Sequence, residues 1–301
     1  MELLTKRKGM RVLITGSNGL LGQKLVKIFS SDHQTSGIDL QAEPFINPPN
    51  FRYQNISITE KDKLEKLFAA FKPEAVINAG AYTDVDGCEK NKEKAWEVNV
   101  EGVKNLSRLC RENKAKLVQL STDYIFDGKA GPYSEEDTPN PKGYYGVTKL
   151  ESEKVILDSK IDFLIVRTNV LYGKSLGETH NFVLWLIQKL KNREEVKIVT
   201  DQYSNPTLAD NLVEAIKEAT EKNISGVLNI AGGEKVLSRY EFALKIAEKF
   251  NLNQSLIKKV LTSELNLPAP RPLKGGLKID KAKKLLKTEL LDVDKGLEYI
   301  R

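Results

Sequence analysis

Few residues of this chain are of the kinds that build disulfide-bonded, zinc-binding or membrane-spanning proteins. Its 301 residues include two cysteines and two histidines, and Cys88 and Cys110 show no metal-ligand spacing with the histidines. No stretch approaches the roughly 18 uninterrupted apolar residues that a membrane-spanning helix requires, and residues 1–9 lack the apolar segment of a secretory signal. We therefore expect a cytoplasmic protein with reduced cysteines, no metal site and no membrane contact.

Charge of one sign is also scarce. The sequence has 47 Lys and Arg against 41 Asp and Glu, a net charge of +6, and the two signs are interspersed rather than gathered in a basic block. This pattern is typical of a solvated surface and argues against a nucleic-acid partner. With 301 residues, of which 40% are hydrophobic, the chain is large enough for about two domains.

The sequence from Arg11 onward alternates compact β-rich runs with longer helical patterns. This is the order expected of a parallel sheet with helices on both faces, so it predicts an α/β, Rossmann-like, doubly wound core. The predicted strands cover residues 11–15, 35–39, 74–78, 116–121 and 162–167. The predicted helices between them lie at about 60–71, 90–113 and 144–158.

Three glycines follow the first predicted strand directly. Gly16, Gly19 and Gly22 form a GxxGxxG pattern at the opening of a predicted helix. Glycines at this point allow a tight turn and let backbone amides approach a phosphate, whose negative charge the helix N-terminus favours. In this strand-to-helix context the pattern predicts a dinucleotide-binding site, although the same glycines can form a plain turn.

The second predicted strand ends at Asp39. A carboxylate at this position can accept hydrogen bonds from both hydroxyls of an adenosine ribose, and it would repel a 2′-phosphate. No Lys or Arg stands at Ser17, Asn18, Leu40 or Gln41 to receive such a phosphate. We therefore favour NAD(H) as the cofactor, with NADP(H) as the alternative.

Beyond Arg167 the regular alternation weakens. Helical patterns continue at about 181–191, 207–221 and 238–250, with a short strand at 226–230. We expect a smaller, partly interleaved α/β substrate lobe. The predicted NAD(P)-binding Rossmann domain comprises 10–167 plus about 193–222, and the predicted substrate-binding lobe comprises about 168–192 and 223–301.

A second motif lies at the start of the helix predicted over 144–158. Tyr145 and Lys149 are four residues apart, which places a phenol and an ammonium on one helix face. An ammonium close by lowers the pKa of a phenol, so we expect Tyr145 to exchange protons near neutral pH. Thr122 follows the strand before this helix, at the sheet edge where ligands bind, and its hydroxyl can orient a carbonyl.

These motifs, in this order, resemble the extended short-chain dehydrogenase/reductase family and, within it, the dTDP-4-dehydrorhamnose reductases. The narrower resemblance depends on STDYIFDG (121–128), PYSEEDTPNPKGYYGVTKLESE (132–153), RTNVLYG (167–173), DQYSNPT (201–207), NIAGGE (229–234) and APRPLKGGL (269–277). It extends from Met10 nearly to the end of the chain, so it covers both predicted domains.

The resemblance implies that Thr122, Tyr145 and Lys149 form the catalytic triad, with Asp123 and Tyr124 beside it in the substrate pocket. The cofactor contacts that it implies, besides the three glycines, Asp39, Tyr145 and Lys149, are Leu20, Leu21, Asn55, Ile56, Ala79, Gly80 and Ala81. Members of the family are often dimers, which leaves a homodimer open here.

The residue after Asp123 separates the reactions of this family. The nucleotide-sugar dehydratases of this family carry Asp-Glu after the Thr, as an acid/base pair for eliminating water, whereas in this chain Asp123 is followed by Tyr124. Reduction of a carbonyl needs only a hydride from the nicotinamide and one proton, which Tyr145 can donate. We therefore expect reduction without elimination. The resemblance implies NAD(P)H-dependent reduction of the C4 carbonyl of a nucleotide-linked keto sugar, dTDP-4-dehydro-L-rhamnose above all, to dTDP-L-rhamnose.

The chain departs from the reductases at two places near the expected substrate. Val170 stands where they typically have Trp, and Asp84 and Gly87 differ from their usual AxTAVDxAE-like run. Arg271 lies in a Pro-rich loop and can form bidentate hydrogen bonds to the diphosphate of a nucleotide, or it can be an exposed loop arginine.

Two other functions stay open. One is a different NAD-dependent nucleotide-sugar epimerase or reductase with the same Tyr and Lys. The other is a non-catalytic, NAD(P)-binding regulatory subunit, because the methionine adenosyltransferase β subunits resemble the same segments. That role does not require Thr122, Tyr145 and Lys149 together, so their presence favours an enzyme.

Overall fold

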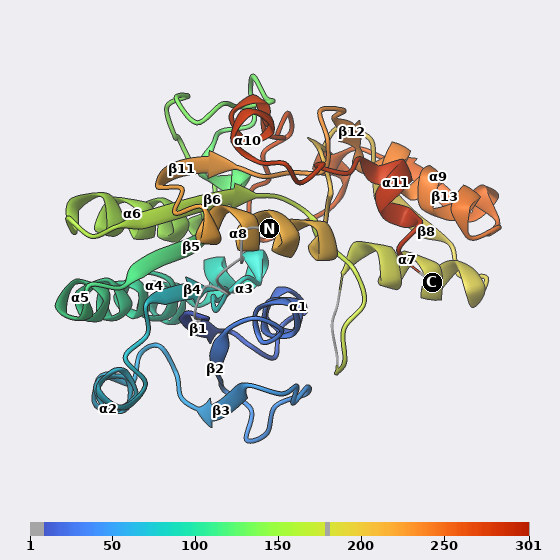
Figure 1. The fold of residues 1–301 in the computed structure, drawn as a ribbon. Coiled ribbons are helices and arrows are strands. Elements are labelled where there is room, and N and C mark those ends of the chain that lie inside the picture. The colour runs from blue at the N-terminus through green and yellow to red at the C-terminus, as the bar shows by residue number, and fades with distance from the viewer. Residues whose placement is uncertain (1–8, 178–180, 301) are drawn as a thin grey trace.

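The computed structural model of the chain describes residues 9–177 and 181–300. Its centre is a parallel sheet of seven strands in the order β11-β6-β5-β4-β1-β2-β3 (Figure 1). The strands are β1 (Arg11–Thr15), β2 (Gln34–Asp39), β3 (Phe51–Asn55), β4 (Ala75–Asn78), β5 (Lys116–Thr122), β6 (Phe163–Thr168) and β11 (Gly226–Asn229). The chain winds outward from β1 in both directions, so the topological switch point lies between β1 and β4. The predicted fold class is confirmed.

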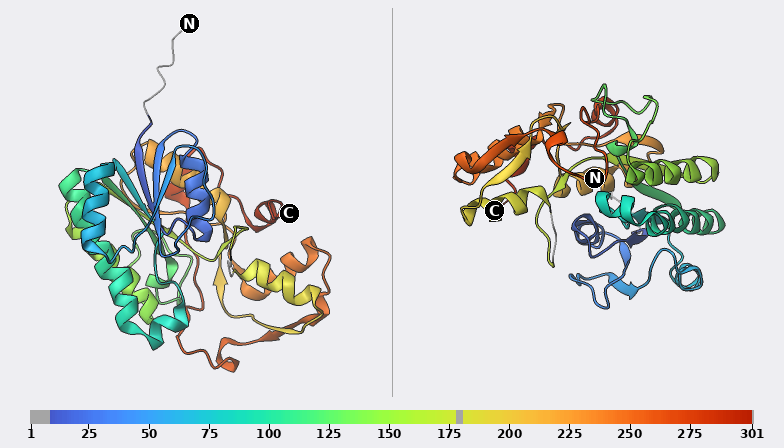
Figure 2. Two further views of the ribbon diagram at one scale, coloured as in Figure 1. Left: turned by 90° about the horizontal axis from the view of Figure 1, so that it is seen from below. Right: turned by 180° about the vertical axis from the view of Figure 1, so that it is seen from behind.

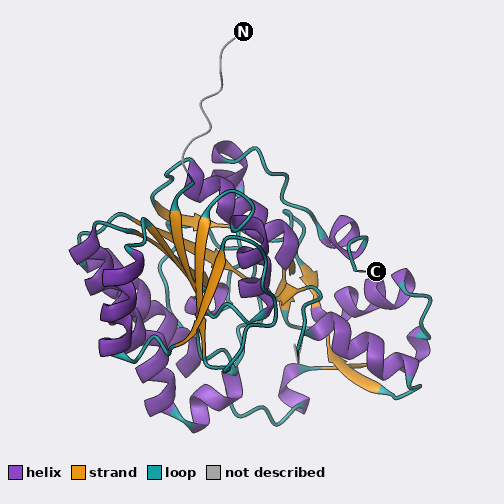
Figure 3. Cartoon of the chain, turned by 60° about the horizontal axis from the view of Figure 1, so that its bottom comes forward, coloured by secondary structure: helices purple, strands orange, loops and turns teal. Residues whose placement is uncertain are grey.

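Continuous apolar runs produce strands that are buried on both faces. In β1, Val12, Leu13 and Ile14 are all fully buried. Because successive side chains of a strand point to opposite faces, Val12 and Ile14 join one core cluster and Leu13 joins the other. The sheet therefore needs helices on both sides, and Figure 3 shows its strands lying between layers of helices.

Each face of the sheet has its own set of helices. One face packs against α1 (Leu20–Phe29), α8 (Ala209–Glu221) and α10 (Asp280–Leu285). The other face packs against α2 (Lys61–Phe71), α5 (Gly102–Asn113) and α6 (Tyr144–Asp158). Before α5 the chain forms α3 (Val85–Lys90), α4 (Lys92–Trp96) and a π-helical turn, Glu97–Glu101.

A third apolar cluster lies beside the sheet rather than on it (Figures 1 and 2). Here β8 (Val196–Val199) pairs in parallel with β13 (Ile257–Val260), against α7 (Phe182–Lys191), α9 (Arg239–Lys249) and α11 (Val293–Leu297). Two short pairs, β7 (Leu171–Tyr172) with β10 (Thr207–Leu208) and β9 (Tyr203–Ser204) with β12 (Leu237–Ser238), lie in the segments that connect it to the sheet. In the described ranges, no helix is long and apolar enough to cross a membrane.

Two strands pair with a different part of the chain than the predicted domain boundaries assign to them. The sequence places 226–229 in the substrate lobe, but β11 pairs with β6 as an edge strand of the large sheet. It places 196–199 in the Rossmann domain, but β8 pairs with β13 and contributes Val196 and Ile198 to the third cluster. The division of the chain into two domains otherwise stays a prediction.

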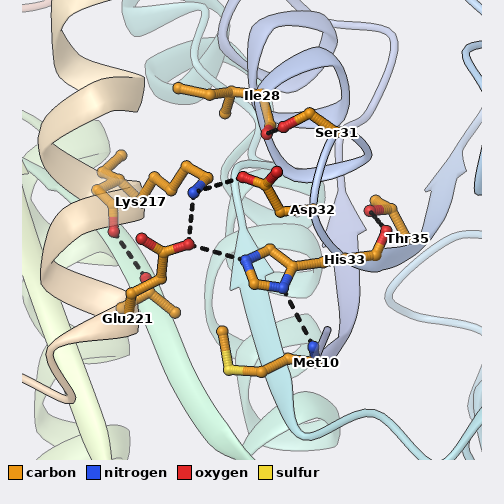
Figure 4. Close-up of polar contacts among 10 residues, drawn as sticks. Met10, Ile28, Ser31, Asp32, His33, Thr35, Lys217 and Glu221 are labelled. Carbon is orange, nitrogen blue, oxygen red and sulfur yellow. Dashed lines mark hydrogen bonds and ion pairs between the residues drawn. The ribbon is translucent and has the colours of Figure 1, made fainter. Parts of the chain in front are cut away.

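A polar cluster ties α8 to the turn between α1 and β2 (Figure 4). His33 Nδ1 accepts the backbone N–H of Met10 at 3.1 Å, and Nε2 lies 3.0 Å from a carboxylate oxygen of Glu221. A ring nitrogen that accepts carries no proton, so the proton of His33 is on Nε2 and is donated to Glu221. Lys217 pairs with both Glu221 and Asp32, at 3.0 Å from the latter. Lys217 and Glu221 of α8 thereby hold Asp32 and His33 in the turn after α1, and His33 in turn holds Met10 before β1.

Candidate active site

A cavity of about 860 Å³ lies at the carboxyl edge of the sheet, along the ends of β1, β2, β4 and β5. In an open parallel sheet, the diverging loops at the switch point create such a crevice. The predicted site residues that line it are Gly16, Gly19, Leu20, Leu21, Gly22, Asp39, Ile56, Ala79, Gly80, Ala81, Thr122, Tyr145, Lys149 and Val170. Those that do not line it are Asn55, Asp123, Tyr124 and Arg271.

The glycine turn after β1 permits a close approach between backbones. Gly16 has a φ of +65°, and a Cβ on it would lie 2.6 Å from the nitrogen of Gly80. A Cβ on Gly22 would lie 1.9 Å from the carbonyl oxygen of Gly16, so α1 could not begin so close to the turn. Gly19, the N-cap of α1, has no side chain to accept the first amides of the helix. Leu20, Leu21 and Gly22, which carry these amides, line the cavity, and the N-terminus of a helix suits an anionic diphosphate.

Asp39 is held at the end of β2 by backbone donors. One carboxylate oxygen accepts the N–H of Asn18 at 2.8 Å and the other accepts that of Leu40 at 2.7 Å. Each oxygen keeps a second lone pair, so the carboxylate can still accept from a ribose. Asn55, in contrast, donates its side-chain amide to the carbonyls of Asp39 and Gln41, which ties β3 to this loop.

The three predicted catalytic residues lie on two adjoining elements. Thr122 ends β5, and its hydroxyl accepts the N–H of Tyr124 at 3.2 Å. Tyr145 and Lys149 lie in the first turns of α6. The ammonium of Lys149 donates to the carbonyl of Leu120 at 2.6 Å, which holds the helix against β5. The structure thus brings a hydroxyl, a phenol and an ammonium to one wall of the cavity.

The electrostatics of this wall differ from the expectation. Burial raises the pKa of Tyr145, and the hydroxyl of Thr122 opposes this only in part. Burial lowers the pKa of Lys149 to about 8, against the opposing charge of Glu153. The predicted lowering of the Tyr145 pKa by Lys149 is therefore wrong for these side chains: desolvation of the phenol dominates. Tyr145 is protonated at neutral pH, as a proton donor must be.

Asp123 and Tyr124 do not line the cavity, although both follow Thr122 directly. Asp123 is 3% exposed, and one of its oxygens accepts the N–H of Gly276 at 3.2 Å. Burial raises the pKa of Asp123 to about 6. The ring of Tyr124 meets that of Tyr145 edge to face, at 5.8 Å between centroids. Asp123 thus connects the end of β5 to the loop that carries Gly276, and Tyr124 packs on Tyr145.

Arg271 does not line the cavity, and it is not an exposed loop arginine, because its side chain is 13% exposed. Its guanidinium donates to Asp86 on α3 at 2.9 Å and to the carbonyl of Ala269 at 2.9 Å. The N–H of Ala269 also donates to Asp86 at 3.0 Å, so Asp86 fastens the Pro-rich loop to α3. Val170 does line the cavity, with a φ of +38° that is rare for a β-branched residue.

Four asparagines line the cavity, Asn18, Asn78, Asn169 and Asn181, and none of them is among the predicted site residues. Asn18 lies within the glycine motif itself, and its side chain accepts the N–H of Phe45 at 2.9 Å. Asn169 follows the end of β6, so its place after a parallel strand was a signal that could have found it. Asn181 caps α7 and accepts the N–H of Leu184 at 3.3 Å.

Comparison with known proteins connects this geometry to a family. The family described as the RmlD substrate binding domain matches residues 10–300. A dTDP-4-dehydrorhamnose reductase of Aggregatibacter actinomycetemcomitans is 31% identical, over 97% of this chain and 98% of the relative. The methionine adenosyltransferase 2 subunit beta of Mus musculus is 29% identical, over 91% of this chain and 82% of the relative.

A solved structure has the same architecture. The crystal structure of dTDP-4-dehydrorhamnose reductase from Bacillus anthracis in complex with NADP superposes with a TM-score of 0.84 at 29% identity. The match covers 96% of this chain and 98% of that one. The likeness therefore includes both the large sheet and the segments beside it.

Proposed function

The chain belongs to the RmlD substrate binding domain family, and on that premise we propose that it reduces the C4 carbonyl of a nucleotide-linked 4-keto sugar with NADH or NADPH. The leading substrate is dTDP-4-dehydro-L-rhamnose, which gives dTDP-L-rhamnose. The observation that carries the proposal is the meeting of Thr122, Tyr145 and Lys149 with the glycine turn and Asp39 in one cavity. The enzyme class, a reductase of the extended short-chain dehydrogenase/reductase type, follows from the family.

The part of the cavity lined by the glycine turn and Asp39 suits a dinucleotide. The first amides of α1 would hold the diphosphate, and Asp39 would accept the hydroxyls of the adenosine ribose. When bound, the reduced nicotinamide supplies the hydride. Because Asp39 would repel a 2′-phosphate, the proposal includes a preference for NADH over NADPH. Lys149 would donate a hydrogen bond to the nicotinamide ribose from its place beside Leu120.

Two hydroxyls act on the substrate in the proposed reaction. Thr122 and Tyr145 donate hydrogen bonds to the carbonyl oxygen, which polarises the carbonyl and places it on the wall of the cavity. Tyr145 then transfers its proton to the oxygen as negative charge develops there. A raised phenol pKa keeps this proton in place until then, and the alkoxide is a much stronger base that takes it readily.

Elimination of water is not supported by the groups at this site. A dehydratase would need a second acid/base pair beside Thr122, but the next carboxylate, Asp123, is buried and accepts the N–H of Gly276. The residue after it is Tyr124, whose ring packs on Tyr145. The proposal is therefore a reduction without elimination.

The test is consumption of reduced nicotinamide with dTDP-4-dehydro-L-rhamnose generated in situ, beside a GDP-linked 4-keto sugar and with NADH and NADPH in turn. Rapid oxidation with the dTDP substrate and NADH supports both the reaction and the role of Asp39. Equal rates with NADH and NADPH would contradict only the cofactor preference. Oxidation with the GDP-linked sugar alone would keep the reaction and change the substrate.

A second function is favoured by the similarity to the methionine adenosyltransferase β subunit. In that role the chain would bind a dinucleotide and stabilise a partner without turnover. Binding of NADH together with silence toward every keto sugar, and co-purification with a synthetase, would support it. A cytoplasmic location and a homodimer remain predictions, and the free thiols of Cys88 and Cys110 suit a reducing compartment.

A further inference from the structure

Gln23 is a buried polar residue on a helix face that is otherwise apolar. It is 4% exposed, and the other large buried side chains of α1 are those of Leu21, Leu25, Val26 and Phe29. Burial of an amide costs free energy unless its polar atoms have hydrogen-bond partners. A leucine or a methionine would fill the same space without that cost, so the partners of Gln23 indicate what the glutamine adds.

The partners of Gln23 are backbone groups of two segments. Its Nε2 donates to the carbonyl of Asn18 at 2.7 Å and to that of Leu176 at 2.9 Å, and its Oε1 accepts the N–H of Leu176 at 2.9 Å. The side chain thus pairs with both polar backbone groups of Leu176, as a neighbouring strand would. Both hydrogens of the amide are used, so its orientation is fixed.

Leu176 belongs to residues 174–177, which we call the strap. The strap lies between β7 and α7, in a part of the chain that runs past α1 (Figure 1). Apolar packing does little to hold it, because Leu176 is 57% exposed. Within residues 9–177 and 181–300, the two bonds to Gln23 are the only hydrogen bonds of the strap backbone. A segment with so few contacts opens more readily than the core.

The strap also contacts the loop that joins β2 to β3. Gly177 has a φ of +77°, and a Cβ on it would lie 2.6 Å from Cε2 of Phe45, so this ring packs directly on the glycine backbone. The N–H of Phe45 is in turn held by the side chain of Asn18, within the glycine turn. The strap is therefore connected to the glycine turn through Gln23 and to the β2–β3 loop through Phe45.

These contacts join two segments that border the cavity beside the glycine turn. On the side of β2 the cavity is lined by Leu40, Gln41 and Phe45. On the side of the third apolar cluster it is lined by Leu171 and Asn181, and the strap lies between these two residues in the sequence. A diphosphate at the first amides of α1 would therefore have the strap beside it.

We propose that the strap gates the dinucleotide site and that Gln23 is the positioning residue that keeps this gate closed. The inference rests on the proposed function, because a reductase takes up NADH and releases NAD⁺ once in every turnover. Neither Gln23 nor Gly177 lines the cavity, so both act on the cofactor through the strap rather than by contact. A gate slows entry and exit alike, whereas a residue that only shapes the binding site changes the affinity.

The test is stopped-flow measurement of NADH binding, followed by nicotinamide fluorescence, with wild type, Gln23→Met and Gly177→Ala. The methionine keeps the volume of Gln23 and makes none of its hydrogen bonds, and the alanine places a Cβ against Phe45. We expect the rate constants of entry and exit both to rise in Gln23→Met, by about tenfold for the loss of two hydrogen bonds to the strap. Gly177→Ala should change both rates in the same direction, and Kd should stay nearly constant in both variants.

The matched control is Gln188→Met, which makes the same replacement at an exposed position of α7 and should keep the wild-type rates. Hydrogen exchange of the Leu176 amide gives a readout without cofactor. We expect this exchange to be faster in Gln23→Met, since its acceptor is lost, while exchange in β5 stays slow and shows that the variant is folded.

The outcomes separate this inference from the proposed function. Unchanged rates of NADH entry and exit in Gln23→Met, or unchanged exchange at Leu176, would overturn the inference. A faster exit with an unchanged entry, and hence a weaker affinity, would also overturn it, because that result indicates a change in the binding site rather than a gate. Faster entry and exit in Gln23→Met, without turnover of any keto sugar by the wild type, would contradict the proposed function alone.

Discussion

The buried ion pair between Glu153 and Arg167 holds the catalytic helix to the sheet, and its removal gives a strong prediction. Glu153 lies on α6, one turn after Lys149, and Arg167 lies on β6. The side chains are 1% and 5% exposed, with Nη2–Oε2 at 2.7 Å and Nε–Oε1 at 3.1 Å. Ser121 on β5 donates to the same carboxylate at 2.5 Å. One carboxylate therefore connects α6, β5 and β6.

Glu153→Gln keeps the shape of the side chain and removes its charge. Arg167 then stays buried with an amide in place of a carboxylate, and loss of one partner of a buried pair costs about 3–5 kcal/mol. We expect the free energy of unfolding, measured by urea denaturation, to fall by about 3 kcal/mol with an unchanged slope. Replacing both partners by methionine removes the unpaired charge, so it is expected to restore most of the stability.

The matched control is Glu112→Gln on α5. Glu112 pairs with Arg108 at 2.9 Å, but the two side chains are 49% and 36% exposed, so water screens the pair. Exposed pairs at this spacing contribute about 0.3–0.5 kcal/mol. If Glu153→Gln and Glu112→Gln lowered the free energy of unfolding by the same amount, the role assigned to the buried carboxylate would be refuted.

Three further changes test other parts of the structure. Asp39→Ala removes the acceptor for the adenosine ribose, so we expect KM for NADH to rise about tenfold or more and the NADH preference to fall; an unchanged ratio of the two cofactors in steady-state assays would contradict this. His33→Phe keeps the packing on Phe29 but leaves the N–H of Met10 unpaired, so we expect a loss of about 1–3 kcal/mol in urea unfolding without loss of turnover; an unmoved midpoint would count against the cluster. Burial lowers the pKa of Lys149 to about 8, so its ammonium is present below that pH and is lost above it. We therefore expect kcat/KM for NADH to fall as pH rises through 8. A wild-type profile that is flat across pH 8, or one no steeper than that of Lys149→Arg, would exclude a role of the Lys149 ammonium in cofactor binding.

Strong local patterns made much of the fold predictable. The helix α6 covers residues 144–158 as expected, because a helical pattern of 15 residues follows a glycine-rich loop. In contrast, β3 was missed because FRYQN is an exposed edge strand without an apolar run. The strand at 226–229 was expected, but a short apolar run does not say which sheet it joins. Its pairing with β6 depends on contacts between distant segments.

Some residues of the candidate site could also be predicted from local sequence, and others depend on contacts between distant segments. Residues at the end of a strand, such as Asp39 and Thr122, or directly after one, such as Gly16, were predictable because the topology brings strand ends to one edge. Arg271 was not, because its partner Asp86 is 185 residues away in the sequence. The ammonium of Lys149 has the expected helical spacing from Tyr145, yet burial decides the pKa of the phenol, and burial is a property of the whole fold.

The most direct test of the central claim compares wild type, Tyr145→Phe and Tyr299→Phe in the reduction of dTDP-4-dehydro-L-rhamnose by NADH. Tyr299 is 61% exposed and serves as the control for loss of a phenol. We expect Tyr145→Phe to bind NADH like the wild type and to lose most of its turnover, roughly 100-fold or more for a missing proton donor. Tyr299→Phe should be fully active. Undiminished turnover by Tyr145→Phe would contradict the assignment of Tyr145 as the proton donor and, with it, the proposed mechanism.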